Sequence, residues 1–327
     1  MLTEARGLGQ FDDASLIHAL ATPPLDASTW CTLDARLLKD YDRFYGLQFI
    51  GLDRHLALID CAGERIAMQA FVPTSRTVRA WAVVCHGYYD HVGLYGPLIR
   101  DLLLRDIAVV TFDQPGHGLS TGDRANIADF QQYVDVIEVI HKFAAKSALD
   151  KPLHWFGQSM GGALVMEYWQ QRKLEKPTGE LVLLAPLVRP YAWPLMRWAF
   201  ALAKATVKAR PRNMSSNMQN QEFVRLLAAD PLQAKVLPVS WVQAMVKWFN
   251  QFEAYPSSTL PLNIIQGYED RTVSFRHNLR VLKRRYLNAA IHIIPAARHH
   301  LVNEVPAIYA EIWAWLDDLC DWYKFKS

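Results

Sequence analysis

The chain contains 327 residues, of which 51% are hydrophobic and 20% are charged, and its formal net charge at pH 7 is +3. This balance excludes extensive disorder and argues against a dedicated nucleic-acid binder, which would carry a strongly basic face. No continuous apolar run is long enough to cross a membrane, and Met1–Gln10 lacks the apolar stretch of a signal peptide.

The cysteines favour a reducing compartment. They lie far apart, with neither paired nor metal-like spacing, at Cys31, Cys61, Cys85 and Cys320. Free, mostly buried thiols are the better interpretation of this pattern. We therefore expect a cytoplasmic protein whose contact with a membrane, if any, is peripheral and at the inner face.

Two antiparallel strands are predicted to open the fold, after an N-terminal helical extension at residues 1–45. From about Leu47 to Val72 the sequence alternates, and the alternation breaks at Asp60-Cys61-Ala62-Gly63. A break of this kind between two alternating runs is typical of a hairpin.

Short apolar runs separated by helix-length stretches follow the hairpin. Ala80–Cys85 and Ile107–Phe112 flank Gly93–Leu104, which is the spacing of a βαβ unit. Similar runs come later, at Leu153–Phe156, Leu181–Leu184, Leu262–Gln266 and Ile291–Ile294. The pattern predicts an α/β fold with a doubly wound, mostly parallel sheet, and functional residues are expected at the carboxyl ends of its strands.

Residues 188–256 interrupt this alternation of strands and helices, since they contain no convincing strand. We predict that they form a helical cap inserted after the sixth strand, between core segments 46–187 and 257–327. The stretch is rich in Trp and Met, which suit an adaptable apolar pocket. The residues expected to line the substrate pocket are Trp193, Trp198, Trp241, Met245 and Trp248. A helical subdomain that holds these side chains in its own core is the alternative.

The segment from Leu153 to Gly162 contains the pattern G-x-S-x-G between a predicted strand and a predicted helix. Ser159 would then occupy a strained turn, and glycine at positions 157 and 161 would remove clashes between the strand and the helix. The turn would aim the N–H of Met160 at a reacting oxygen. A Gly-Ser turn without chemistry is the alternative.

A second oxyanion donor is expected in the loop after Ala80–Cys85. This loop begins His86-Gly87-Tyr88, and the N–H of Tyr88 is the candidate. We expect His86 and His91 to be structural. No metal site is expected from the nearby histidines, because no carboxylate or thiolate completes a recognisable ligand set.

A serine nucleophile needs a base, and the base needs a carboxylate that fixes its tautomer. Two later strand-end loops carry the candidates. In the first, Asp270 is preferred over Glu269 as the acid. In the second, His299 and His300 are adjacent, and the pattern by itself leaves the choice of base open.

Several motifs, in this order, resemble the monoacylglycerol lipase and lysophospholipase group of α/β-hydrolases, also called serine aminopeptidase-like. His86–Tyr95 is similar to H-G-x-x-E-H-x-x-x-Y, and Asp113–Ser120 is similar to D-x-x-G-H-G-x-S. Gly157–Gly162 resembles G-H-S-M-G-G, while Gly267–Asp270 and His299–Glu304 resemble G-x-x-D and H-x-x-x-N-E.

The resemblance implies that Ser159 is the nucleophile, Asp270 the acid and His299 the base, with the N–H groups of Tyr88 and Met160 as the oxyanion hole. The sequence departs from the group at three positions. Gln158 replaces a usual His, Asp90 stands where Glu is usual, and Tyr88 is bulkier than the usual small residue. These departures bear on substrate preference and leave the catalytic groups in place.

The expected activity is hydrolysis of a small-molecule acyl ester, such as a monoacylglycerol or lysophospholipid, through an acyl-enzyme and without a metal or other cofactor. A peptide or amide hydrolase of the aminopeptidase-like branch and a non-catalytic ligand-binding homologue are the alternatives. Arg197, Lys204 and Lys208 would share one face of a helix over Leu195–Lys208, which could contact anionic lipid or simply be solvated.

Overall fold

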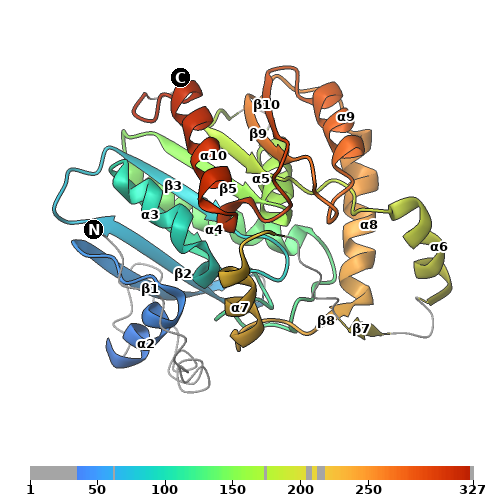
Figure 1. Ribbon diagram of the computed structural model, residues 1–327, viewed down its shortest axis with the longest axis horizontal. Coiled ribbons are helices and arrows are strands. Elements are labelled where there is room, and N and C mark those ends of the chain that lie inside the picture. Colours follow the sequence, from blue (N-terminus) through green and yellow to red (C-terminus); the bar gives the residue numbers. More distant parts are fainter. Residues whose placement is uncertain (1–34, 62, 173–174, 204–207, 212–217, 325–327) are drawn as a thin grey trace.

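The computed structural model describes residues 35–61, 63–172, 175–203, 208–211 and 218–324. Its centre is a sheet of eight strands in the order β1-β2-β4-β3-β5-β6-β9-β10 (Figure 1). The strands are β1 (Leu52–Cys61), β2 (Glu64–Pro73), β3 (Ala80–Cys85), β4 (Ile107–Phe112), β5 (Leu153–Gln158), β6 (Leu181–Leu184), β9 (Leu262–Gly267) and β10 (Ala289–Ile294).

Strand direction changes only at one edge of this sheet. The pairs β1/β2 and β2/β4 are antiparallel, whereas β3, β4, β5, β6, β9 and β10 are paired in parallel. The predicted fold class and the opening hairpin are therefore confirmed. Strands β4 and β5 lie on opposite sides of β3. The order in which the chain adds strands to the sheet therefore reverses at β3. The carboxyl ends of β3 and β5 border the crevice that such a reversal creates.

Helices cover both faces of the sheet, as Figure 1 shows. Along β3, alternate side chains enter two separate cores, with Val83 on one face and Val84 on the other. Because both faces are covered, the parallel strands read as continuous apolar runs. The helices outside the insertion are α2 (Ala35–Tyr45), α3 (Gly96–Leu104), α4 (Gln131–Ala148), α5 (Met160–Gln171), α9 (Phe275–Arg285) and α10 (Pro306–Leu319), with short 3-10 turns at η1 (Val92–Tyr95) and η2 (Leu301–Asn303).

The segment between β6 and β9 is mainly helical. It contains α6 (Trp193–Ala203), α7 (Gln221–Ala229) and α8 (Val239–Ala254). It also contains β7 (Ala209–Pro211) and β8 (Val236–Pro238), which pair antiparallel and which the sequence did not indicate. Strands of three residues are too short to leave a readable period.

The prediction of one helix over Leu195–Lys208 was wrong at its carboxyl end. Helix α6 is assigned only as far as Ala203, and the carbonyl of Lys208 accepts the N–H of Val239 at 2.9 Å, next to the β7/β8 pair. Lys208 therefore lies in a bend beside the strand pair and not on a helix face. Lys204 and Cys31 lie outside the described residues, as does most of the predicted N-terminal extension.

Within the described residues, no helix is both long enough and apolar enough to cross a membrane.

Candidate active site

Ser159 occupies the turn between β5 and α5 in a strained conformation, with φ 53° and ψ −113°. The flanking glycines explain how this turn fits. A Cβ at Gly161 would lie 2.0 Å from the carbonyl oxygen of Cys85, and a Cβ at Gly157 would lie 2.6 Å from the carbonyl carbon of Gly161. Only glycine permits this approach of strand, turn and helix. The turn holds Ser159 at the carboxyl end of β5.

His299 and Asp270 reach Ser159 from the loops after β10 and β9. Nε2 of His299 lies 2.9 Å from Oγ of Ser159, and Nδ1 lies 2.8 Å from Oδ2 of Asp270. An ionised Asp270 requires the proton on Nδ1, which leaves Nε2 free to accept the serine hydroxyl. The three side chains thus form one continuous row of hydrogen bonds.

Asp270 is surrounded by donors that keep it ionised. Its Oδ1 accepts the N–H groups of Thr272 and Val273 at 2.8 and 3.0 Å, and its Oδ2 accepts Nε2 of Gln266 at 2.9 Å. Burial acts to raise the pKa of Asp270, but the imidazole of His299 and these hydrogen bonds outweigh burial and lower that pKa. The carboxylate is therefore charged at neutral pH, as a base-orienting acid must be.

Two buried glutamines support this row, and the sequence did not point to Gln266. Besides its bond to Asp270, Gln266 donates to the carbonyl of Gly267 at 3.0 Å. Gln158, the residue that departs from the usual His, donates from Nε2 to the carbonyl of His299 at 2.9 Å. The Gln158 amide therefore fixes the backbone of His299. The signal for Gln266 was its position at the end of β9, just before the loop that carries Asp270.

The loop after β3 lies directly beside Ser159. A Cβ added to Gly87 would be 3.5 Å from Cβ of Ser159. His86 fixes this loop, since its Nδ1 lies 2.7 Å from the carbonyl of Gly87 and its Nε2 accepts the N–H of Gln114 at 2.8 Å. Burial lowers the pKa of His86, which suits a neutral ring with one donor and one acceptor. The prediction of a structural His86 is confirmed by these contacts.

The bulky Tyr88 turns its side chain toward the helical insertion. Its ring stacks on Trp241 of α8, with centroids 3.6 Å apart and an interplanar angle of 16°. Its hydroxyl donates to the carbonyl of Ala125 at 2.8 Å. Tyr88 thereby ties the loop beside Ser159 to α8.

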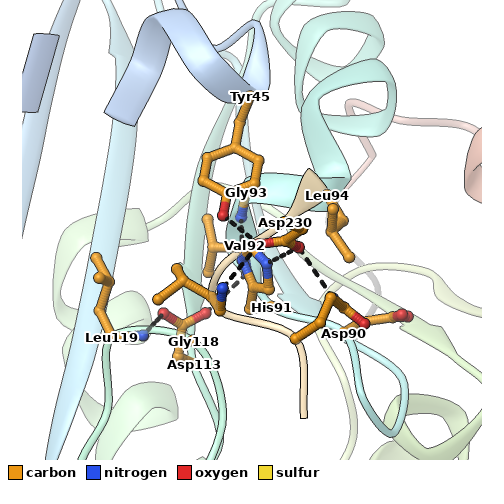
Figure 2. A network of polar contacts seen from close by, with 12 residues as sticks. Tyr45, Asp90, His91, Val92, Gly93, Leu94, Asp113, Gly118, Leu119 and Asp230 are labelled. Atoms are coloured by element: carbon orange, nitrogen blue, oxygen red, sulfur yellow. Dashed lines mark hydrogen bonds and ion pairs between the residues drawn. The ribbon is translucent and has the colours of Figure 1, made fainter. Parts of the chain in front are cut away.

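Figure 2 shows a buried polar network that joins the same loop to two other parts of the chain. Nε2 of His91 lies 2.8 Å from Oδ2 of Asp230, which follows α7, and the hydroxyl of Tyr45 from α2 donates to Oδ1 at 2.6 Å. Burial acts to lower the pKa of His91, but Asp230 outweighs burial and raises it. His91 is thus structural, as predicted.

Asp113, also drawn in Figure 2, supports the neighbouring turn. Its Oδ1 accepts the N–H of Val92 at 2.7 Å and its Oδ2 accepts that of Leu119 at 2.8 Å. Gly118 has φ +48°, and a Cβ there would lie 2.3 Å from the Asp113 carboxylate. This motif therefore shapes a tight loop. Among the described residues, no group of three or more His, Cys, Asp and Glu side chains could hold a metal ion.

The structure distinguishes between the two adjacent candidates for the acid and between the two adjacent candidates for the base. Nε2 of His300 lies 3.1 Å from Oδ2 of Asp90, away from Ser159. The Glu269 side chain is 51% exposed and faces Arg298, whereas Asp270 is 2% exposed. The geometry brings together His299, Asp270 and Ser159, and leaves His300 and Glu269 outside the row.

The residues predicted to line a substrate pocket differ in their exposure to solvent. Trp193, Trp241, Met245 and Trp248 are buried, and Trp241 contacts the loop beside Ser159 through its stacking on Tyr88. Trp248 stacks on Phe130 and donates from Nε1 to Glu167 at 3.0 Å. The Trp198 side chain is 66% exposed. Trp248 therefore packs in the core, and Trp198 faces solvent.

Comparisons with a family model and with individual proteins give consistent matches. Residues 76–306 match the family model described as serine aminopeptidase, S33. The human monoglyceride lipase is 27% identical over 277 residues, which cover 79% of this chain and 89% of that protein. The monoacylglycerol lipase of Mycolicibacterium smegmatis is 26% identical over 272 residues, covering 80% and 93%.

Among solved structures, a soluble variant of monoglyceride lipase from Saccharomyces cerevisiae in complex with a substrate analog is similar, with a TM-score of 0.72. It is 18% identical, and the match covers 86% of this chain and 99% of that one. At this level of identity the similarity concerns the fold.

Proposed function

Because this chain belongs to the serine aminopeptidase S33 family of α/β-hydrolases, and is a serine hydrolase, we propose that it cleaves carboxylic esters of acyl lipids such as monoacylglycerols or lysophospholipids. The observation that carries the proposal is the row Ser159–His299–Asp270, with contacts of 2.9 and 2.8 Å at the carboxyl edge of the sheet.

In this mechanism His299 removes the hydroxyl proton of Ser159 as Oγ attacks the ester carbonyl. Asp270 stabilises the imidazolium that forms and keeps it oriented. The backbone N–H groups of Tyr88 and Met160 hold the oxyanion, and a single donor of this kind is worth about 100-fold to 1,000-fold in kcat. His299 then gives its proton to the leaving alcohol. Water, activated by His299, releases the fatty acid from Ser159.

The insertion supports an acyl-lipid substrate. Trp241 stacks on Tyr88 beside the nucleophile, and Met245 is buried one turn further along α8. Apolar side chains in this position suit a hydrocarbon chain better than a hydrated amine. The names of the relatives agree, since the human and mycobacterial proteins are lipases that act on monoacylglycerols.

We further propose that α6 makes peripheral contact with lipid. Leu195 is 76% exposed, and Met196 and Trp198 are exposed beside it. Arg197 on the same helix is also exposed, and its guanidinium lies 5.3 Å from the Trp198 ring. Exposed apolar residues with an adjacent cation are typical of helices that lie at a membrane interface. A cytoplasmic location at the inner face of the membrane stays a prediction from the sequence.

The proposal predicts a strong dependence on acyl-chain length. We expect kcat/KM for p-nitrophenyl esters to rise at least about 30-fold from acetyl to octanoyl, because each buried methylene contributes up to about 0.8 kcal/mol and only part of this is realised. Initial rates below the micellar concentration provide the measurement.

Aminoacyl p-nitroanilides serve as the comparison substrates. Faster turnover of these amides, or of the acetyl ester, would contradict the lipid-ester assignment and favour the amide-hydrolase branch. Absence of turnover with every substrate in folded protein would instead favour a non-catalytic ligand-binding homologue.

A further inference from the structure

The loop after β3 contains a strained turn where it passes the nucleophile. The N–H of Asp90 donates to the carbonyl of Gly87 at 3.1 Å, which closes a four-residue turn. Tyr89, the third residue of this turn, has φ 72°. A positive φ at that position is typical of a type II turn and is normally left to glycine, so a tyrosine there is strained. Strained backbone of this kind persists only where surrounding contacts hold it.

The side chain of Tyr88, the second residue of the turn, is held at two points. One face of its ring stacks on Trp241 of α8, with centroids 3.6 Å apart and an interplanar angle of 16°. Its hydroxyl donates to the carbonyl of Ala125 at 2.8 Å. A side chain fixed at its ring and at its hydroxyl has little rotational freedom. The backbone that carries the N–H of Tyr88 is therefore held with it.

The two points that hold Tyr88 are joined to each other. Ala125 is followed by Asn126, and Trp241 is preceded by Ser240. The hydroxyl of Ser240 donates to Oδ1 of Asn126 at 2.6 Å. The contacts thus form a closed ring, which limits how far the two points can separate.

Helix α8 is itself attached to the core. Nζ of Lys247 lies 2.5 Å from Oδ2 of Asp129, and the ring of Trp248 stacks on Phe130 with centroids 5.0 Å apart. The Trp241 side chain is 5% exposed. Trp241 therefore offers Tyr88 a fixed surface.

We propose that Tyr88 and Trp241 are positioning residues, whose stacked rings hold the N–H of Tyr88 at the oxyanion. Helix α8 of the insertion would then contribute to the chemical step as well as to binding of the acyl chain. The inference rests on the proposed function, in which that N–H is an oxyanion donor, and deepens it. Every ester passes through an oxyanion, so loss of the stacking should slow short and long acyl esters alike.

The test measures hydrolysis of p-nitrophenyl acetate and p-nitrophenyl octanoate by three variants. We expect Trp241→Leu to lower kcat and kcat/KM by about 10-fold for both esters, because an aromatic pair contributes up to about this factor and acts here only in the transition state. Tyr88→Phe loses only the bond to Ala125 and should lower both parameters about 3-fold. Trp241→Phe keeps an aromatic face and should recover most of the activity that Trp241→Leu loses.

Inhibition by a short trifluoromethyl ketone provides a second readout. Oγ of Ser159 adds to the ketone carbon, the hydroxyl proton passes to His299, and the carbonyl oxygen becomes an oxyanion. We expect the inhibition constant to rise in each variant by the factor by which kcat/KM falls.

The matched control is Phe249→Leu. Phe249 is buried on the same helix, and its ring packs on Trp193 with centroids 5.1 Å apart. This variant should keep kcat for the acetate ester within about 2-fold of the wild type, and thermal melts confirm that each variant is folded.

A loss confined to the octanoate ester would mean that Trp241 only lines the acyl pocket, and it overturns the inference while the proposed function stands. An equal loss in Phe249→Leu, or an unchanged inhibition constant in the Tyr88 and Trp241 variants, overturns it too. If Trp241→Leu does not fold, Trp241→Phe and Tyr88→Phe decide by the same criteria. Failure of the wild type to hydrolyse either ester contradicts the proposed function itself, and the inference falls with it.

Discussion

Replacing Ser159 with alanine is expected to lower kcat/KM for a medium-chain ester by roughly 10⁵-fold or more, since no other group can carry the acyl intermediate. The hydroxyl has one described side-chain contact, the 2.9 Å bond to His299, so its removal should leave the fold intact. Steady-state rates with enzyme-free controls, together with a thermal melt, measure both effects.

The matched control for this substitution is Ser257→Ala, which alters an exposed serine on the loop before β9. It should keep wild-type rates. Retention of more than about a tenth of the wild-type activity in a cleanly purified Ser159→Ala protein would mean that another residue is the nucleophile.

Replacing Asp270 with asparagine is expected to lower kcat by roughly 10³-fold to 10⁴-fold at neutral pH. Oδ1 and Oδ2 of Asp270 together accept four donors, from Thr272, Val273, Gln266 and His299. An amide has only one acceptor oxygen, so its NH2 group must face at least one of these donors. If it faces Nδ1 of His299, the imidazole shifts its proton to Nε2 and can no longer accept the proton of Ser159.

The neighbouring carboxylate provides the control. Glu269→Gln changes a half-exposed side chain that pairs with Arg298 at 3.8 Å, and we expect it to alter kcat for a neutral ester by less than about 3-fold. A large loss in the Glu269 variant combined with a small loss in the Asp270 variant would show that the acid was assigned to the wrong residue. The measurement is kcat at saturating ester, across pH 6 to 9.

The sequence predicted the order of strands and helices because the patterns that indicate them are local. Buried parallel strands appear as short apolar runs, and the strained turn at Ser159 requires glycine on both sides. The errors in the predicted elements arose where tertiary contacts determine the local structure. Helix α6 ends at Ala203, and Lys208 lies just before β7, which pairs with β8 more than twenty positions later in the sequence.

The sequence limited the candidates for the catalytic residues, but it could not identify every residue of the site. His299 and His300 are adjacent, and no local pattern says which imidazole faces the nucleophile. The structure separates them through contacts with residues far away in the chain, since His300 is 3.1 Å from Asp90 and His299 is 2.9 Å from Ser159. Asp230 was missed for the same reason, because its partner His91 lies 139 residues away in the sequence. Gln266 was missed although Asp270 is near in the sequence, because the conformation of the loop after β9 decides which side chains meet there.

The central claim is that the hydroxyl of Ser159 is the group activated by His299. Treatment with a fluorophosphonate probe, followed by peptide mapping in a mass spectrometer, tests it most directly. We predict one stoichiometric adduct on Ser159 in the wild-type protein, and its loss in a folded His299→Ala variant. Folded wild-type protein that takes up no probe, or that carries it on a different serine, would contradict the claim.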